Sequence, residues 1–252
     1  MNLLIDVGNT RIKSALGQGD ALSAHRAQPW RDLDLNEVFA HLWSDHASLA
    51  RIVVSHVAGE AFERALDDWL WQRFAVRAEF VRSVPHALGV TCAYPDPTQL
   101  GVDRWVAVQA AAFLTDRTAL VIDCGTATTV DLLTHDKIHR GGAILPGVAT
   151  MRRALAGDTA NLNVPDGHVH AFADNTRDAI AGGTAYAVCG AIDRLAHEAQ
   201  TTYGDAPIAL ITGGEAELVR PLLTTPTQLI PDLVLQGLAH IAQSGDKSSF
   251  GH

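Results

Sequence analysis

One pattern occurs twice in this chain of 252 residues, and it limits the folds that the chain can adopt. The segments LLIDVGNTRIKSAL (residues 3–16) and LVIDCGTATTVDLL (residues 120–133) both run from an apolar strand into Asp-X-Gly, a hydroxyl residue and a second strand. One copy alone is equally typical of a surface hairpin, because Gly-Asn is ordinary turn chemistry. Two copies about half a chain apart predict duplicated lobes, with the ligand site in the cleft between them.

The segments around the two copies alternate between strand and helix patterns. Apolar residues at helical spacing predict helices at 35–43, 59–74 and 103–114, and the branched run RIVVSHV (51–57) predicts a buried strand. The segment PIALITGGEAELVRPLL (207–223) predicts a strand, a glycine pair and a helix. The expected organisation is an α/β fold with an N-terminal lobe at 1–116, a C-terminal lobe at 117–245 and a mobile tail at 246–252.

Composition excludes several classes of protein. The formal net charge is −9 and no dense Lys/Arg cluster occurs, which argues against nucleic acid as a partner. Three widely spaced cysteines give no disulfide framework or zinc pattern, and they favour a reducing cytoplasm. No apolar run approaches the ~18 residues of a membrane span, and no secretory leader is recognisable. We therefore expect a cytoplasmic protein with no membrane partner.

The chemistry of the repeated turn predicts a phosphate site. A tight glycine turn lets backbone N–H groups approach an anion, and the hydroxyls of Thr10 and Thr126 are suited to donate to phosphate oxygens. Carboxylates beside phosphate require a cation between them, which is the role expected for Asp6 and Asp123. Neither GxxxxGK[ST] nor a GxGxxG after a strand is present. The sequence thus predicts a nucleotide held by paired hairpins.

Six segments in order, from residue 6 to residue 214, resemble one family. DVGNTRIK, GVDRW, DCGTATTVD, GGAILPG, NTRDAIAGG and TGG are together similar to type III pantothenate kinase, within the acetate and sugar kinase, Hsp70 and actin superfamily. The resemblance implies two duplicated ribonuclease H-like (actin-like) lobes with a cleft between them. It also implies a homodimeric kinase that uses ATP to phosphorylate the terminal hydroxyl of pantothenate, the first step of coenzyme A synthesis. The implied cations are Mg²⁺ or another divalent ion, and K⁺ or NH₄⁺.

The resemblance also implies roles for individual residues. Asp6 would organise the divalent cation, Asp123 would bind the monovalent one, and Asp103 would be the catalytic base. The implied nucleotide contacts are Asp6, Gly8, Asn9, Thr10, Lys13 and Thr126. The implied pantothenate contacts are Tyr94, Gly101, Val102, Asp103, Arg104 and, from across the dimer interface, Thr176. Thr184 lies nearby and competes with Thr176 for this last assignment.

The residues themselves agree with the role given to Asp103. Transfer of a phosphoryl group to an alcohol needs a group that orients the hydroxyl and accepts its proton, and a carboxylate beside an arginine suits that task. A plainer interpretation is that Asp103 only caps the helix that starts there.

Two further interpretations concern residues outside the catalytic segment. Cys124 beside the cation site predicts sensitivity to thiol reagents, and the tryptophans are interpreted as packing residues.

Two other functions remain open from the sequence. Some relatives of this family are described as accessory factors to transcription, so one alternative is a nucleotide-responsive regulator with the same fold. The retained Asp103 and Arg104 argue against it, because a regulator needs no catalytic base. The second alternative is a related kinase that acts on another small hydroxylated acid or sugar.

Overall fold

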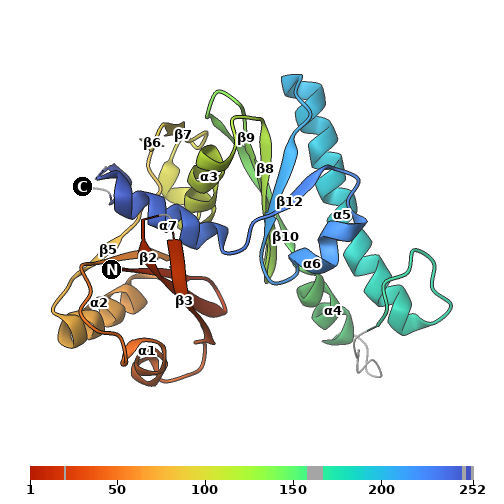
Figure 1. Ribbon diagram of the computed structural model, residues 1–252. Coiled ribbons are helices and arrows are strands. Elements are labelled where there is room, and N and C mark those ends of the chain that lie inside the picture. The colour runs from red at the N-terminus through yellow and green to blue at the C-terminus, as the bar shows by residue number, and fades with distance from the viewer. Residues whose placement is uncertain (20, 158–166, 246–247, 251–252) are drawn as a thin grey trace. The chain divides into compact units, whose positions relative to one another are not determined.

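The computed structural model describes residues 1–19, 21–157, 167–245 and 248–250 (Figure 1). The chain forms two compact units. The first combines Met1–Leu114 with Asp232–His252, and the second is Thr115–Pro231. Each unit is built on one five-stranded sheet.

The sheet of the first unit has the strand order β3-β2-β1-β4-β5. Strands β1, β2 and β3 pair antiparallel, whereas β4 lies parallel to both β1 and β5. The strands are β1 (Asn2–Val7), β2 (Arg11–Gln18), β3 (Ala21–Pro29), β4 (Arg51–His56) and β5 (Ala78–Phe80). A small separate hairpin joins β6 (His86–Ala87) to β7 (Val90–Thr91).

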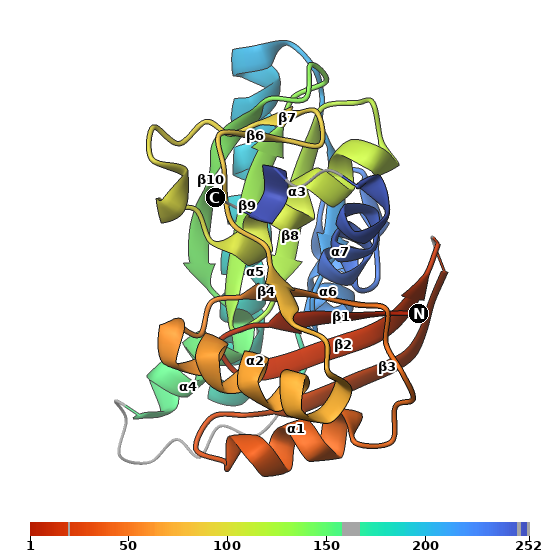
Figure 2. The same ribbon diagram turned by 90° about the vertical axis from the view of Figure 1, so that its left-hand side faces the viewer.

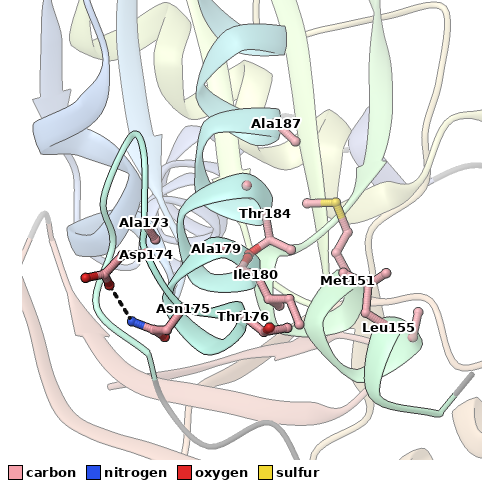
Figure 3. A pocket seen from close by; sticks show the side chains of 12 residues that line it. Met151, Leu155, Ala173, Asp174, Asn175, Thr176, Ala179, Ile180, Thr184 and Ala187 are labelled. Atoms are coloured by element: carbon pink, nitrogen blue, oxygen red, sulfur yellow. Dashed lines mark hydrogen bonds between the residues drawn. The ribbon is translucent and has the colours of Figure 1, made fainter. Parts of the chain in front are cut away.

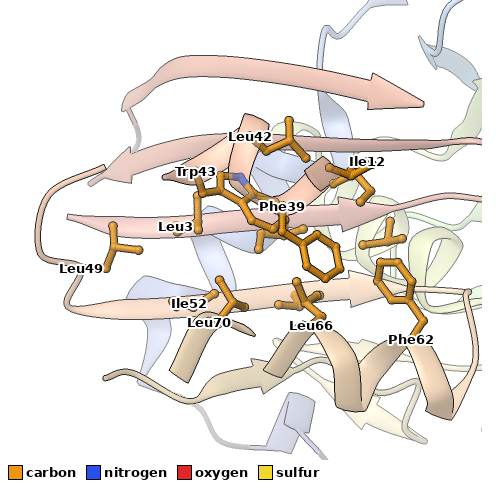
Figure 4. Packing of buried hydrophobic residues seen from close by; sticks show 14 residues of the cluster. Leu3, Ile12, Phe39, Leu42, Trp43, Leu49, Ile52, Phe62, Leu66 and Leu70 are labelled. Atoms are coloured by element: carbon orange, nitrogen blue, oxygen red, sulfur yellow. The ribbon is translucent and has the colours of Figure 1, made fainter. Parts of the chain in front are cut away.

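One face of this sheet is covered by α1 (Leu35–Trp43) and α2 (Glu60–Phe74), as Figures 2 and 4 show. Strand β1 alternates, so that every second side chain points to this face. Helix α2 presents apolar residues at a spacing of four, which keeps them on one side. The buried cluster includes Leu3, Ile5, Val7, Phe39, Trp43, Phe62, Leu66 and Leu70.

The opposite face carries α3 (Val102–Leu114) and α7 (Leu233–Ser244), which also pack on each other. The two helices come close together at Gly237, where a Cβ atom would lie 2.6 Å from the Val106 carbonyl oxygen. Only glycine permits this contact between the two helices. The short 3-10 helices of the unit are η1 (Pro97–Gln99) and η3 (Ser248–Phe250).

The sheet of the second unit repeats the first, with the order β10-β9-β8-β11-β12. Again three strands pair antiparallel and the last two add in parallel. The strands are β8 (Ala119–Cys124), β9 (Ala127–Leu133), β10 (His139–Pro146), β11 (Ile208–Thr212) and β12 (Thr227–Leu229). Its helices are α4 (Val148–Gly157), α5 (Thr176–Tyr203), α6 (Ala216–Val219) and the 3-10 helix η2 (Arg220–Leu222).

The core of the second unit lies between this sheet and α5. Val188, Ile192 and Ala196 recur along one side of α5 and pack on Leu120 and Ile122 of β8. The matching strand orders of the two units confirm the predicted α/β fold with duplicated lobes.

Three local features differ from the sequence expectation. The predicted lobe boundary placed 117–245 together, but α7 lies with the first unit, against β1 and β4. Of the predicted mobile tail, residues 248–250 are folded, with Ser249 buried and its carbonyl accepting the Arg82 N–H at 2.8 Å. Residues 246–247 and 251–252 of that tail lie outside the described residues. Trp71 is 45% exposed, so the packing interpretation is wrong for this tryptophan.

Candidate active site

The first predicted phosphate hairpin joins β1 to β2 in the first unit. Asp6 pairs in register with Lys13 on β2 and with Ser55 on β4, so the three side chains share one face of the sheet. Gly8 N donates to Arg11 O at 3.0 Å and closes the turn. Ser55 is fully buried, and its hydroxyl has no hydrogen-bond partner among the described residues. The sequence analysis did not select Ser55, because its place beside Asp6 follows only from the strand register.

The second predicted hairpin joins β8 to β9 in the second unit and has the same arrangement. Asp123 pairs in register with Thr129 on β9 and with Thr212 on β11. Where the first hairpin has a lysine and a serine beside its aspartate, the second therefore has two threonines. Carboxylate and hydroxyl oxygens are the hard ligands that suit alkali and alkaline-earth cations.

Gly213 follows Thr212 and packs directly against Asp123. Its φ is +97°, and a Cβ atom there would lie 2.4 Å from Asp123 Oδ1 and 2.4 Å from the Cys124 carbonyl oxygen. Any other residue would have to displace the carboxylate or the strand end. The TGG motif thus supplies a glycine that the Asp123 position requires.

Glu215, two residues later, fixes the start of helix α4. Its carboxylate accepts the N–H groups of Val148 at 2.8 Å and Ala149 at 2.7 Å, and its own N–H donates to Cys124 O at 2.9 Å. Gly147 N in turn donates to Thr126 O at 3.0 Å. One carboxylate therefore links the second hairpin to the helix N-terminus, which is the end of the dipole that favours negative charge. Sequence reasoning missed Glu215, since its partners lie 66 and 67 residues away.

Cys124 does not match the expectation of thiol sensitivity. Its side chain is fully buried. Burial, with the neighbouring carboxylates of Asp123 and Glu215, raises the pKa of the Cys124 thiol well above its ordinary value. A buried thiol with a raised pKa reacts poorly with alkylating reagents, so the structure argues against the predicted sensitivity at this residue.

The predicted substrate residues other than Thr176 lie at the start of α3 in the first unit and in the loop before it. Asp103 Oδ1 accepts the backbone N–H of Arg104 at 2.8 Å. Arg104 is buried, with only 7% of its surface exposed. Its Nη1 donates to the Tyr94 hydroxyl at 3.3 Å. A Cβ atom on Gly101 would lie 2.7 Å from Asp103 Oδ1, so glycine leaves the room that the carboxylate occupies. Val102 is the first residue of the helix.

Ser83 stabilises the loop before this helix through a hydrogen bond to its backbone. The Ser83 hydroxyl is buried and donates to Leu100 O at 2.8 Å, while Trp105 N donates to Gly101 O at 3.0 Å. These contacts fix the backbone on both sides of Asp103. The structure therefore places Asp103 and Arg104 at the start of α3 and brings the Tyr94 hydroxyl, from the preceding loop, against the Arg104 guanidinium.

Thr176 and Thr184 both line an open, largely apolar pocket of about 850 Å³ in the second unit (Figure 3). Thr176 is exposed at the first turn of α5, after Asn175, whose side chain accepts the Asp178 N–H at 3.0 Å. Thr184 is 5% exposed, and its hydroxyl donates to Ile180 O at 2.8 Å. A hydroxyl already engaged within its own helix is the weaker candidate for a substrate contact, which favours Thr176.

The predicted cation positions, at Asp6 and Asp123, have few acidic, histidine or cysteine side chains around them within the described part of the chain. Among the residues that the structure describes, no group of three or more His, Cys, Asp or Glu side chains is placed to hold a metal ion. Mg²⁺ in nucleotide sites is commonly held by one or two carboxylates together with phosphates and water, and Asp6 fits that pattern.

Within the described ranges, no helix is long and apolar enough to span a membrane.

Comparisons with known proteins agree with the motifs. A family model described as type III pantothenate kinase matches residues 2–198. A relative from Nitrosococcus oceani named type III pantothenate kinase is 35% identical over 254 residues, which cover 98% of this chain and 96% of the relative.

Two solved structures share the fold. A protein described as a Baf family transcriptional activator from Campylobacter jejuni has a TM-score of 0.62 at 20% identity, covering 96% of this chain and 98% of that one. A glucokinase from an Antarctic psychrotroph has a TM-score of 0.50 at 13% identity, covering 97% and 99%. At these identities the likeness concerns the fold alone.

Proposed function

The chain belongs to the type III pantothenate kinase family, and we infer that it transfers the γ-phosphoryl group of ATP to the terminal hydroxyl of pantothenate. This reaction is the first step of coenzyme A biosynthesis. The observation that supports the residue roles is the placement of Asp103 and Arg104 at the start of α3, with the Tyr94 hydroxyl from the preceding loop against the Arg104 guanidinium.

Arg104 and Tyr94 bind and orient the acceptor. The Arg104 guanidinium carries the charge that the carboxylate of pantothenate requires, and Tyr94 holds it in place through the 3.3 Å contact. Gly101 and Val102 shape the backbone around them. The substrate is thereby fixed with its hydroxyl near Asp103, and such positioning supplies much of the rate enhancement in phosphoryl transfer.

Asp103 is the general base. As the hydroxyl oxygen bonds to the γ-phosphorus and the bond to the bridging oxygen of ADP breaks, the hydroxyl proton passes to the Asp103 carboxylate. The contact with the Arg104 N–H holds the Asp103 carboxylate in place at the start of α3. The plainer interpretation of Asp103 as a helix cap is compatible with this role, because one oxygen of the carboxylate can hold the Arg104 N–H while the other faces the substrate.

The two hairpins hold ATP and the cations. Gly8, Asn9 and Thr10 bind phosphate oxygens with Lys13 nearby, and Thr126 contacts the nucleotide from the second hairpin. Asp6 would hold the divalent cation, which would neutralise charge on the phosphates. Asp123 would hold K⁺ or NH₄⁺, and the register neighbours Thr129 and Thr212 support this choice because they add hydroxyl oxygens.

The enzyme acts as a homodimer in the cytoplasm. Thr176 contacts pantothenate bound to the other subunit, and its exposure at the start of α5 supports that role. Three cysteines without a disulfide, as far as the structure describes them, agree with a reducing compartment.

An assay of ADP release tests the substrate. Pantothenate, glycerol, acetate and hexoses are each supplied with ATP, Mg²⁺ and K⁺, and we expect release with pantothenate alone. Turnover with a hexose or acetate and none with pantothenate would assign the chain to another kinase. Replacing K⁺ by Na⁺ in the same assay tests the monovalent site, where we expect a loss of activity.

A further inference from the structure

The carbonyl groups of the first phosphate turn contact two adjacent residues, Trp30 and Arg31. Trp30 Nε1 donates to Gly8 O at 2.9 Å, Arg31 Nε donates to Asn9 O, and Trp30 N is 3.4 Å from Thr10 O. Arg31 Nη2 also lies 3.4 Å from Asn9 Oδ1. Two adjacent residues from the β3–α1 connection thus bind the oxygens of three consecutive peptide groups.

This arrangement determines where the N–H groups of the turn point. In a planar trans peptide the C=O and the following N–H are directed to opposite sides. The carbonyls of Gly8 and Asn9 are turned toward Trp30 and Arg31, so the N–H groups of Asn9 and Thr10 are directed to the other side of the turn. Successive N–H groups on one side form a concave anion site, whereas carbonyl oxygens on that side would repel phosphate.

The pair itself is anchored in the first unit. The Trp30 ring packs on Phe62 of α2 with ring centroids 4.9 Å apart, and the Arg31 guanidinium lies 5.0 Å from the Trp30 ring centroid. The indole therefore contacts both an aromatic ring of the core and a cation. A fixed donor of this kind limits the conformations open to a turn rich in glycine and polar residues.

The second hairpin has a comparable support built from other residues. Thr126 O accepts the Gly147 N–H at 3.0 Å and the Thr150 hydroxyl at 2.7 Å, and Cys124 O accepts the Glu215 N–H. In both units a neighbouring segment thus binds the carbonyls of the turn.

We propose that Trp30 and Arg31 are positioning residues for ATP: they hold the Gly8–Thr10 turn with its N–H groups directed at the nucleotide phosphates. This role rests on the proposed function, since it assumes that the turn binds the phosphates of ATP. The pair acts through the backbone of the turn and contacts neither the acceptor nor the transferred group.

Two substitutions remove the donors and retain the packing. Trp30→Phe keeps an aromatic ring against Phe62 and loses the indole N–H, while Arg31→Met keeps an aliphatic chain over the indole. The loss of one hydrogen bond of this type should raise the Kd for Mg·ATP about fivefold in each variant. We expect the KM for ATP to rise in parallel and the KM for pantothenate to stay within about twofold of the parent.

Trp30 also supplies a spectroscopic signal. Binding of Mg·ATP to a turn whose carbonyl holds the indole N–H should change the fluorescence of Trp30, and the change should be absent from Trp30→Phe. Trp71→Phe is the matched control, because Trp71 is a partly exposed tryptophan on the outer side of α2. Arg64→Met is the control for loss of an exposed guanidinium.

Measurements of ATP binding and of activity test the positioning role and the proposed function separately. A parent enzyme that binds ATP but does not phosphorylate pantothenate would overturn the proposed function, and the ATP affinities of the variants would still test the pair. Folded variants that bind ATP as tightly as the parent would overturn the positioning role, even where their Tm has fallen. Equal losses of ATP affinity in the control variants would overturn it as well.

Discussion

The Asp103 side chain makes a structural contact that one substitution can preserve while it removes the basicity. Asp103 Oδ1 accepts the Arg104 N–H at the helix start, and this contact requires only an oxygen acceptor. Proton transfer in addition requires a carboxylate with an accessible lone pair. Asparagine retains the first property and lacks the second.

We therefore expect Asp103→Asn to lower kcat by ~10²-fold or more while the Kd for pantothenate changes by only a few-fold, as is typical for loss of a general base. Steady-state kinetics and calorimetric binding measure the two quantities. Asp34→Asn is the matched control, since Asp34 caps α1 through the Glu37 N–H at 3.1 Å and has no proposed role in the reaction. Turnover of the Asp103 variant within threefold of the parent would exclude the base assignment.

Gly213 offers a second prediction at the level of one residue. A methyl group at this position meets Asp123 and the Cys124 carbonyl at 2.4 Å, in a left-handed backbone conformation. We expect Gly213→Ala to lower the free energy of unfolding by about 1–3 kcal/mol and to weaken activation by K⁺. Urea unfolding and a K⁺ titration of activity measure these effects.

The neighbouring glycine is the control for this change. A Cβ atom on Gly214 meets no heavy atom within 4 Å among the described residues. Gly214→Ala should therefore leave the unfolding free energy and the K⁺ dependence nearly unchanged. If both alanine variants behave alike, Gly213 has no special relation to Asp123.

The residues of the candidate site fall into two groups in how well the sequence predicts them. Gly101, Asp103 and Arg104 stand together in one short segment, so a motif is sufficient to select them. Trp30 and Glu215 act on turns that lie 22 or more residues away in sequence, and only the folded chain brings them there. Such residues have no local pattern from which their role can be read.

At the scale of elements, the short helix after β11 shows how a local rule ends a helix. The sequence predicts a strand, a glycine pair and a helix, and the structure has all three. Helix α6, however, spans only Ala216–Val219 before the chain continues as a 3-10 turn. Pro221 has no N–H and its ring opposes a continued α-helix. The element types were predictable, and the helix end depends on one proline.

The junction of α4 with the second hairpin depends on Glu215. Removal of its charge should weaken the N-terminal interaction of α4, because Gln accepts through one oxygen where the carboxylate uses two. We expect Glu215→Gln to lower the unfolding free energy by about 1 kcal/mol and to raise the KM for ATP. Urea unfolding and ATP kinetics provide the measurements.

Glu217→Gln is the matched control for this element. Glu217 lies two residues away and forms a surface ion pair with Arg220 at 3.1 Å. Exposed pairs of this kind contribute little, so both quantities should stay near those of the parent. A Glu217 variant as impaired as the Glu215 variant would show that the charge of the segment matters, and that the cap of α4 does not.

At the scale of the whole molecule, the duplication is the feature that the sequence predicts best. Two related hairpins are sufficient to predict two sheets, and both sheets have the same strand order with an aspartate at the end of the first strand. The sequence does not reveal that the chain returns to its first unit. Helix α7 follows the second unit in sequence, but its contacts are with β1, β4 and α3, and these tertiary contacts leave no local pattern.

The final prediction concerns the dimer and follows from the exposed position of Thr176. If Thr176 reaches the pantothenate site of the other subunit, each site requires residues from two chains. Two inactive variants, Asp103→Asn and Thr176→Trp, are mixed in equal amounts and allowed to exchange subunits. Random pairing makes about half of the dimers mixed, and each mixed dimer has one site with both substitutions and one with neither. About a quarter of the parental activity should therefore return.

The mass of the mixed dimer is the control that shows whether subunits have exchanged. If exchange occurs without recovery, Thr176 does not act across the interface, and Thr184, although its hydroxyl is engaged within α5, becomes the residue to substitute.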